Sequence, residues 1–143
     1  MGKTEILQQW LDKGRDDLRA AEYLSKMHYP TPDEIICFHC QQSAEKYLKG
    51  FLFSYDIEPE KTHDLEHLLE LCQKYNSEFS ILLSNVDILN RYAVSPRYPN
   101  ELEITNEDMK TALSYAKSIQ EFVMKIFNDI DQTDSEANNV ENT

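Results

Sequence analysis

Two arginine–tyrosine pairs in the second half of the chain have the residue types of a phosphate site. Arg91 precedes Tyr92, and Arg97 precedes Tyr98, with a proline on either side of the second pair. A guanidinium group can donate two parallel hydrogen bonds to a phosphate, and a tyrosine ring can stack on a base. The prolines restrict the backbone around the second pair. We therefore expect Arg91, Arg97 and Tyr98 to contact the phosphate or the base of a nucleotide.

The alternative role for these arginines is structural. Asp87, Glu101 and Glu103 lie close to them in the sequence. If these carboxylates pair with the guanidinium groups, the arginines brace a loop and bind no anion.

A second set of polar residues falls on one face of a predicted helix. Gln42, Glu45, Lys46 and Lys49 are related by spacings of three or four residues, so they share that face. They are too polar for the core side of the helix, and we expect them to line the same ligand cleft as the arginines. The alternative is a solvated face on which Glu45 and Lys49 form an i,i+4 ion pair on the wetter side of the helix.

Histidines and cysteines form no recognisable metal or nucleophile motif. Cys37 and Cys40 spell C-x-x-C, but they fall in a strongly helical stretch without a second ligand pair, so we expect packed free thiols. His63 and His67 lie four residues apart at a predicted helix start, where capping by His63 or its neighbour is the simpler explanation. The three glycines are too scattered for a phosphate-binding loop or a nucleophile elbow. We therefore predict no metal, no other cofactor and no catalytic residue.

The charge balance limits the partners of the protein. The chain has 143 residues, of which 26 are acidic and 14 basic, giving a formal net charge of −12. Broad, salt-dependent binding to DNA or RNA needs a basic face, so an acidic chain argues against it. No apolar stretch is long enough to cross a membrane, and no secretory signal is recognisable. We expect a cytoplasmic protein without a membrane partner.

Apolar residues recur at helical spacing between three proline-containing interruptions. The pattern predicts helices over residues 7–24, 33–55, 62–75, 79–94 and 105–130. Similar lengths and short connections favour antiparallel neighbours, so the predicted fold class is all-α, an up-and-down helical bundle of about five helices. We expect residues 1–130 to form a single domain and residues 131–143 to be an acidic, disordered tail.

Three polar residues are expected to cap these helices, namely Asp33, Thr62 and Thr105. Asp108 follows Thr105 by three residues, which is the spacing of a capping box. The second helix has the widest apolar arc, so we expect it to be the most buried element.

Four segments together resemble the HEPN family of small helical domains, named for presumed nucleotide binding. They read WLDKGRDDLRAA, FHCQQSAEKYLKGF, THDL and RYP, at residues 10–21, 38–51, 62–65 and 97–99. The resemblance covers about residues 5–128.

The resemblance implies an up-and-down bundle of the type found in substrate-binding subunits of nucleotidyltransferases. It also implies a homodimer and a minimal nucleotidyltransferase as the usual partner. On this basis we expect a non-catalytic partner protein that binds a nucleotide or nucleic acid.

Two alternatives remain open beside this interpretation. Many HEPN proteins are metal-independent ribonucleases or toxins whose motif is an arginine followed, after four to six residues, by a histidine. No histidine occurs in the seven residues after Arg91, so this motif would be degenerate here and we lean away from an enzyme. The other alternative is a pure oligomerisation or interaction module.

Overall fold

The protein is an all-helical bundle in a computed structural model. The structure describes the backbone of residues 1–93 and 103–141, and the side chains of residues 1–93 and 103–131. Within these ranges it contains five α-helices, two short 3-10 helices and no strand. Their order is α1 (Lys3–Ser25), α2 (Asp33–Ser54), α3 (Leu65–Tyr75), η1 (Ser77–Leu82), α4 (Leu83–Leu89), η2 (Asn90–Tyr92) and α5 (Asn106–Glu141). The predicted fold class is confirmed.

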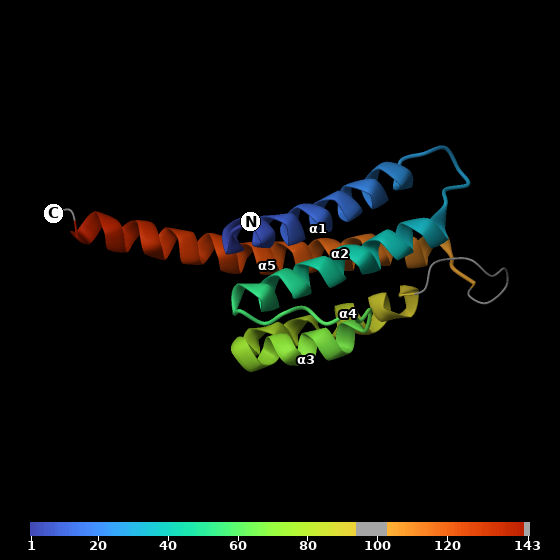
Figure 1. The fold of residues 1–143 in the computed structure, drawn as a ribbon. Coiled ribbons are helices and arrows are strands. Elements are labelled where there is room, and N and C mark those ends of the chain that lie inside the picture. The colour runs from blue at the N-terminus through green and yellow to red at the C-terminus, as the bar shows by residue number, and fades with distance from the viewer. Residues whose placement is uncertain (94–102, 142–143) are drawn as a thin grey trace.

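Helix α2 lies at the centre of the bundle. Helices α1 and α5 run beside it, and α3 with α4 lies on its other side (Figure 1). Its buried side chains include apolar, aromatic and cysteine residues along most of its length. The sequence predicts a strongly buried helix here from its wide apolar arc. The structure agrees, because other helices pack against α2 on several sides.

Helices α1 and α2 are tightly packed at Gly14. The hydroxyl of Ser43 donates a hydrogen bond to the Gly14 carbonyl oxygen at 2.7 Å. A Cβ atom at Gly14 would lie 2.8 Å from Cε2 of Tyr47, which is too short for a normal contact. The phenolic oxygen of Tyr47 accepts a hydrogen bond from Gln120 at 2.8 Å, so this ring also joins α2 to α5.

Some predicted helix boundaries are wrong by a few residues. Asp33 is the first residue of α2, and Pro32 precedes it at the cap position. Asp64, not Thr62, caps α3, because its side chain accepts hydrogen bonds from the backbone N–H groups of Glu66 and His67. Thr62 instead accepts from the Asp64 N–H at 3.1 Å, which tightens the turn before the helix.

The predicted fourth helix is divided into η1, α4 and η2. All three present apolar residues to the core, including Phe79, Val86 and Tyr92. Helical periodicity in the sequence reports which side chains are buried, and it does not distinguish an α-helix from consecutive short 3-10 turns.

Helix α5 extends further than the sequence predicts. It continues to Glu141, past Ile130, and its end projects beyond the other helices in Figure 1. An established helix adds further residues at little cost, so the polar residues after Ile130 are compatible with a helical extension. The separation of a domain at residues 1–130 from a tail at 131–143 remains a prediction.

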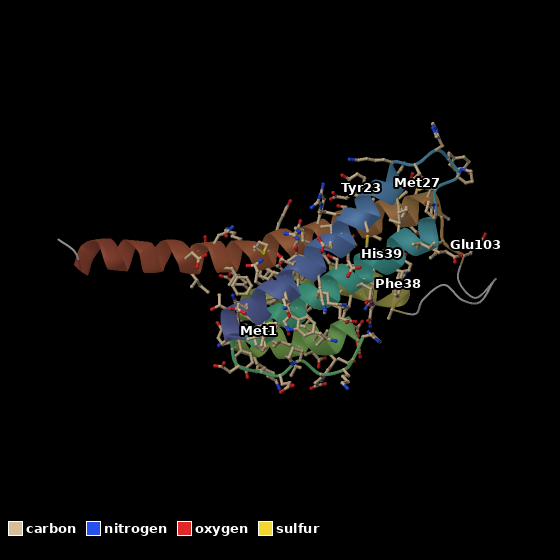
Figure 2. All side chains as sticks on the ribbon, turned by 45° about the horizontal axis from the view of Figure 1, so that its top comes forward. Met1, Tyr23, Met27, Phe38, His39 and Glu103 are labelled. Atoms are coloured by element: carbon tan, nitrogen blue, oxygen red, sulfur yellow. The ribbon has the colours of Figure 1, made fainter. Side chains whose placement is uncertain are left out.

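Large apolar side chains are exposed at the end of α1. Tyr23 and Met27 project there, at the end of the bundle opposite Met1 (Figure 2). No helix in the described part of the chain is both long and apolar enough to cross a membrane.

Candidate functional site

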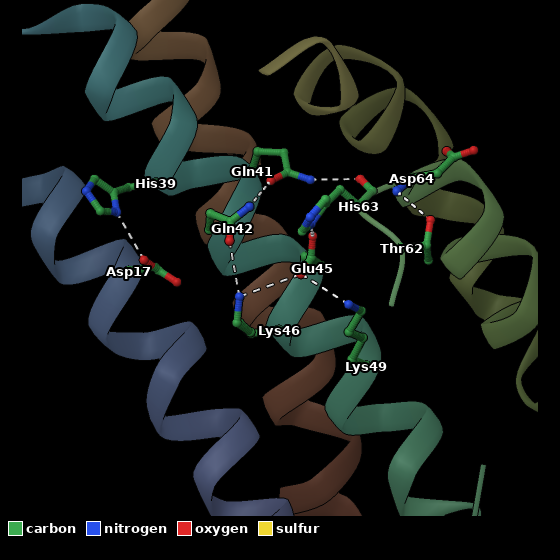
Figure 3. A network of polar contacts seen from close by, with 10 residues as sticks. All are labelled: Asp17, His39, Gln41, Gln42, Glu45, Lys46, Lys49, Thr62, His63 and Asp64. Atoms are coloured by element: carbon green, nitrogen blue, oxygen red, sulfur yellow. Dashed lines mark hydrogen bonds and ion pairs between the residues drawn. The ribbon is translucent and has the colours of Figure 1, made fainter. Parts of the chain in front are cut away.

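The carboxylate of Glu45 is the centre of a polar network on α2 (Figure 3). Its Oε1 atom lies 2.6 Å from Nδ1 of His63, and its Oε2 atom lies 3.2 Å from the Lys49 ammonium and 3.6 Å from that of Lys46. Only 3% of the Glu45 side chain is exposed. A buried carboxylate is costly unless it is paired, and three nitrogen groups satisfy this one.

Two glutamines extend the network toward the loop between α2 and α3. Lys46 donates to the Oε1 atom of Gln42 at 3.2 Å, and the Gln42 amide donates to Oε1 of Gln41 at 2.6 Å. Gln41 in turn donates to the backbone carbonyl of His63 at 2.9 Å. His63 is therefore held by its backbone and by its ring.

The expectation of a wetter side for Glu45 and Lys49 is wrong. The two residues do form the predicted i,i+4 ion pair, but only 3% and 7% of their side chains are exposed. Lys46 is 19% exposed, whereas His63 is 65% exposed. The cause is the loop before α3, which bonds to α2 through His63. Glu45 and Lys49 thus lie beneath a polar surface formed by Lys46 and His63.

His63 has one bonded and one outward ring nitrogen. An ionised carboxylate accepts hydrogen bonds and cannot donate them, so the contact with Glu45 assigns the proton of the neutral ring to Nδ1. The lone pair of that neutral ring is then on Nε2. Sequence reasoning missed His63 because its partner is 18 residues earlier on another element.

The turn that carries Arg91 is tied to the same loop. The Asn90 amide donates to Oδ1 of Asp64 at 3.1 Å, and its side-chain oxygen accepts from the Leu65 N–H at 2.9 Å. These bonds connect η2 to the residues directly after His63. Arg91 thus belongs to a turn that is bonded to the loop carrying His63, and its charge also acts on Asp108 at the start of α5.

Arg91 is exposed, and no described carboxylate lies within 4.0 Å of its guanidinium group. Two of the carboxylates expected to brace the arginines, Asp87 and Glu103, therefore form no ion pair with Arg91. Glu101, Arg97 and Tyr98 lie outside the described residues. The bracing role is not supported for Arg91 within the described part of the chain.

Tyr92 anchors the arginine turn in the core. Its ring is buried, and its hydroxyl forms a hydrogen bond with the Cys37 thiol. Burial raises the pKa of Tyr92 to about 12, so the phenol is neutral and acts structurally. The next residue toward the N-terminus, Arg91, consequently points outward from an anchored turn.

The three cysteines are buried free thiols. Burial raises the pKa of Cys37 and of Cys72 to about 12 and raises that of Cys40 as well, so all three are protonated at neutral pH. Their predicted role as packing residues is confirmed. Among the described residues, no three His, Cys, Asp or Glu side chains are arranged to hold a metal ion.

A second carboxylate–histidine pair joins α1 to α2. Nδ1 of His39 lies 3.0 Å from Oδ1 of Asp17, and both side chains are partly exposed. In Figure 3 this pair lies apart from the Glu45 network. It shares the chemistry of the Glu45–His63 pair, but no lysine among the described residues forms an ion pair with Asp17.

The described residues also form an open groove at the start of α2. Its volume is about 410 Å³, and it is lined by Thr31, Pro32, Asp33, Glu34, Ile35 and Ile104. None of the predicted site residues within the described ranges lines it. The polar network is a surface above buried charges and is separate from this groove.

Comparison with known proteins decides the family. The model of the HEPN domain matches residues 7–127, which is most of the chain. The chain belongs to the HEPN family. A comparison with curated proteins gives no match.

Two solved structures resemble this HEPN domain. The crystal structure of TT1696 from Thermus thermophilus is 25% identical, with a TM-score of 0.71, over 83% of this chain and 96% of that chain. The structure of ST0689, described as an archaeal HEPN homologue, is 26% identical, with a TM-score of 0.66, over 83% and 95%. This chain therefore matches nearly the full length of both solved structures.

Within this HEPN domain, the network and Arg91 combine fixed cations with one outward histidine nitrogen. Such groups can donate hydrogen bonds to an anion, and a neutral histidine can accept a proton. Phosphate recognition uses the first property, and general-base chemistry uses the second.

Proposed function

We propose that this HEPN protein binds the phosphate of a nucleotide and acts as a non-catalytic partner of a minimal nucleotidyltransferase. The observation that carries the proposal is the fixed Glu45 network, which holds Lys46 and His63 beside the loop to which the Arg91 turn is bonded. Preorganised donors lower the entropic cost of binding an anion.

The described site residues have two roles: some can donate hydrogen bonds to a ligand, and the others hold those donors in place. Lys46 has three N–H donors and, among the described residues, contacts Gln42 and Glu45, so at least one donor has no partner there. Arg91 offers five donors and pairs with no described carboxylate. Glu45 and Lys49 are too buried to reach a ligand, so their role is to hold Lys46 and His63 in place. Gln42 retains one amide N–H for a ligand.

The local charge favours a small anion over a long nucleic acid. The network holds Lys46 and Lys49 with the carboxylate of Glu45, and the turn bonded to Asp64 carries Arg91, whose charge also acts on Asp108, within a chain of net charge −12. One phosphate group needs only a few donors, whereas a nucleic-acid tract needs an extended basic face. Arg97 and Tyr98, from the same predicted turn region, remain proposed contacts to the phosphate or base.

Membership of the HEPN family supports the proposed assembly. We expect a homodimer and a complex with a minimal nucleotidyltransferase in the cytoplasm. Light scattering on the purified chain, and co-purification with a nucleotidyltransferase encoded beside it, test these two points. If the chain is a monomer and never associates with that protein, both parts of the proposed assembly are wrong, and only the proposed nucleotide binding remains.

Calorimetric titration of ATP tests the binding site. We expect Arg91→Ala and Lys46→Ala each to weaken binding about tenfold, since each removes a charge-assisted hydrogen bond. Lys110→Ala is the matched control, because Lys110 is exposed on α5 and pairs only with Glu107 among the described residues. Equal affinities in all four proteins, or no binding by the wild type, would contradict the proposal.

A second candidate function, metal-independent RNA cleavage, is favoured by the Glu45–His63 contact. Nε2 of neutral His63 could take the proton of a ribose 2′-hydroxyl, whose oxygen attacks the adjacent phosphorus. A 2′,3′-cyclic phosphate forms while the 5′-oxygen leaves and takes up a proton. Incubation of single-stranded RNA with the protein in EDTA tests this candidate, and cleavage lost in His63→Ala would support it over binding alone.

A further inference from the structure

We propose that His63 is itself a phosphate ligand of this site, and that it binds in its protonated form through Nε2. The inference rests on the proposed function and adds to it a residue that neither the arginines nor the HEPN resemblance assigns. Its basis is the 2.6 Å contact between Nδ1 and Glu45, together with the 65% exposure of the His63 side chain.

Glu45 gives His63 a fixed direction. The carboxylate is buried and held by Lys49, so it cannot turn away from the ring without leaving that lysine unpaired. The Gln41 amide holds the His63 backbone at the same time. His63 is therefore held at two points, by its backbone carbonyl and by Nδ1 of its ring, and Nε2, which has no partner among the described residues, is directed away from the Glu45 carboxylate. A ligand group that is already oriented binds without a further loss of rotamer freedom.

Protonation converts Nε2 into a donor. The neutral ring donates from Nδ1 to Glu45 and can only accept at Nε2, which repels a phosphate oxygen. The protonated ring keeps the Glu45 contact and donates from Nε2 as well. Phosphate binding and protonation of His63 must then favour each other by linkage, because each stabilises the state the other needs.

The charged groups around His63 come from three elements. On α2 they are Glu45, which favours the protonated ring, and Lys46 and Lys49, which oppose it. The loop contributes Asp64 next in the chain, and the η2 turn that carries Arg91 is bonded to Asp64 through Asn90. One carboxylate contacts the ring directly, and a bound phosphate adds negative charge on its open side. Binding therefore becomes tighter as the pH falls.

Two other histidines, His67 and His39, each pair with a carboxylate of their own. Nε2 of His67 lies 2.9 Å from Oε2 of Glu60, so that ring presents its nitrogen to an exposed carboxylate. His39 contacts Asp17 of α1 through Nδ1. His63 is thus the histidine of the described network that combines a buried carboxylate partner with an exposed second nitrogen.

Calorimetric titration of ATP at pH 6.0 and pH 8.0 tests the proposal. We expect the wild type to bind about tenfold more tightly at pH 6.0, and His63→Gln to show only the change that comes from titration of ATP itself. His39→Gln is the matched control, because it removes another histidine that pairs with a carboxylate, and it is expected to keep the wild-type ratio. Circular dichroism checks that the variants are folded.

The outcomes separate this proposal from the proposed function. If the wild type and His63→Gln bind ATP with the same ratio of affinities, His63 is not a ligand although the site still binds nucleotide. If the wild type binds no ATP at either pH, both proposals fail. A direct measurement on the unaltered protein is the NMR titration of His63 with and without ATP: an upward shift of its midpoint supports the proposal, and an unchanged midpoint overturns it, even where His63→Gln does not fold.

Discussion

The side chain of Asn90 bonds to Asp64 and to the backbone of the following residue at once. Its amide nitrogen lies 3.1 Å from Oδ1 of Asp64, and its oxygen accepts from the Leu65 N–H at 2.9 Å. One side chain therefore connects the arginine turn to the first residues of α3. Asp64 also caps that helix, so helix capping and the position of Arg91 depend on the same contact.

Asn90→Ala is expected to loosen the arginine turn while the bundle remains folded. The change leaves the Leu65 N–H without its side-chain acceptor and should cost about 1 kcal/mol of unfolding free energy. Loss of the fixed position of Arg91 should weaken ATP binding as well. Urea unfolding and ATP titration measure the two effects. Asn128→Ala, on an exposed part of α5, is the control, and a matching loss of affinity there would refute the role of Asn90.

Glu45→Gln is expected to destabilise the protein strongly. The substitution keeps the size of the side chain but removes the only charge that Lys49 meets within 4.0 Å among the described residues. Leaving one partner of a buried ion pair uncompensated costs about 3–5 kcal/mol. Urea unfolding provides the measurement.

The control for Glu45→Gln is Glu107→Gln. Glu107 also pairs with a lysine, but its side chain is 84% exposed, so its removal should cost less than about 1 kcal/mol. A double variant, Glu45→Gln with Lys49→Met, should recover part of the loss because it removes the stranded charge. Equal stability of the two single variants would show that the Glu45 pair is effectively solvated.

The sequence predicts which residues share a face of α2, but it does not predict that the loop before α3 covers that face. The 3.6-residue period identifies the face shared by Gln42, Glu45, Lys46 and Lys49, and the i,i+4 pairing of Glu45 with Lys49 follows from the same geometry. Burial of that face depends on where the next loop folds back, which no local pattern encodes. For the same reason His63 could be predicted as a helix-start residue but not as the partner of Glu45.

Helix positions were predictable for a related reason. Each helix buries an apolar stripe, and the stripe is visible in the sequence whatever the exact helix type. Ends are set by single hydrogen bonds, such as the one that moves the cap of α3 from Thr62 to Asp64. The extension of α5 to Glu141 has no apolar stripe to signal it.

Gly14→Ala is expected to destabilise the contact between α1 and α2. The new Cβ would lie 2.8 Å from Cε2 of Tyr47, and this ring cannot easily move because it is buried and bonded to Gln120. Such overpacking costs about 1–3 kcal/mol of unfolding free energy. Replacing glycine by alanine in a helix gains at most roughly 1 kcal/mol, so we expect a net loss of stability.

Gly50→Ala is the matched control for Gly14→Ala. It is also buried within a helix, but a Cβ there would meet its nearest atoms, in Leu11 and Trp10, at 3.3 Å. The propensity gain is the same, so Gly50→Ala should be clearly more stable than Gly14→Ala in thermal or urea unfolding. The reverse order would mean that the close approach at Gly14 is not rigid.

The capping box at the start of α5 should make part of the stability depend on pH. Thr105 donates its backbone N–H to Oδ2 of Asp108 at 2.9 Å, and the Asp108 N–H donates to Oγ1 of Thr105 at 3.1 Å. The backbone hydrogen bond is the main cause that lowers the pKa of Asp108 below its usual value of 3.8, and the Thr105 hydroxyl and Arg91 lower it further. The predicted box is therefore confirmed, and its charged form is the stabilising one.

A carboxyl group whose pKa is lower in the folded state stabilises the fold above its unfolded pKa. That contribution is lost as the pH falls through the folded pKa, because protonation then occurs in both states. Asp108→Asn should consequently be less stable than the wild type at pH 7, and the difference should shrink below pH 3.8. Urea unfolding of both proteins across this range measures it, with Asp131→Asn as the exposed control on the same helix. A difference that stays constant with pH would mean that the N–H bond to the side-chain oxygen, and not its charge, holds the start of α5.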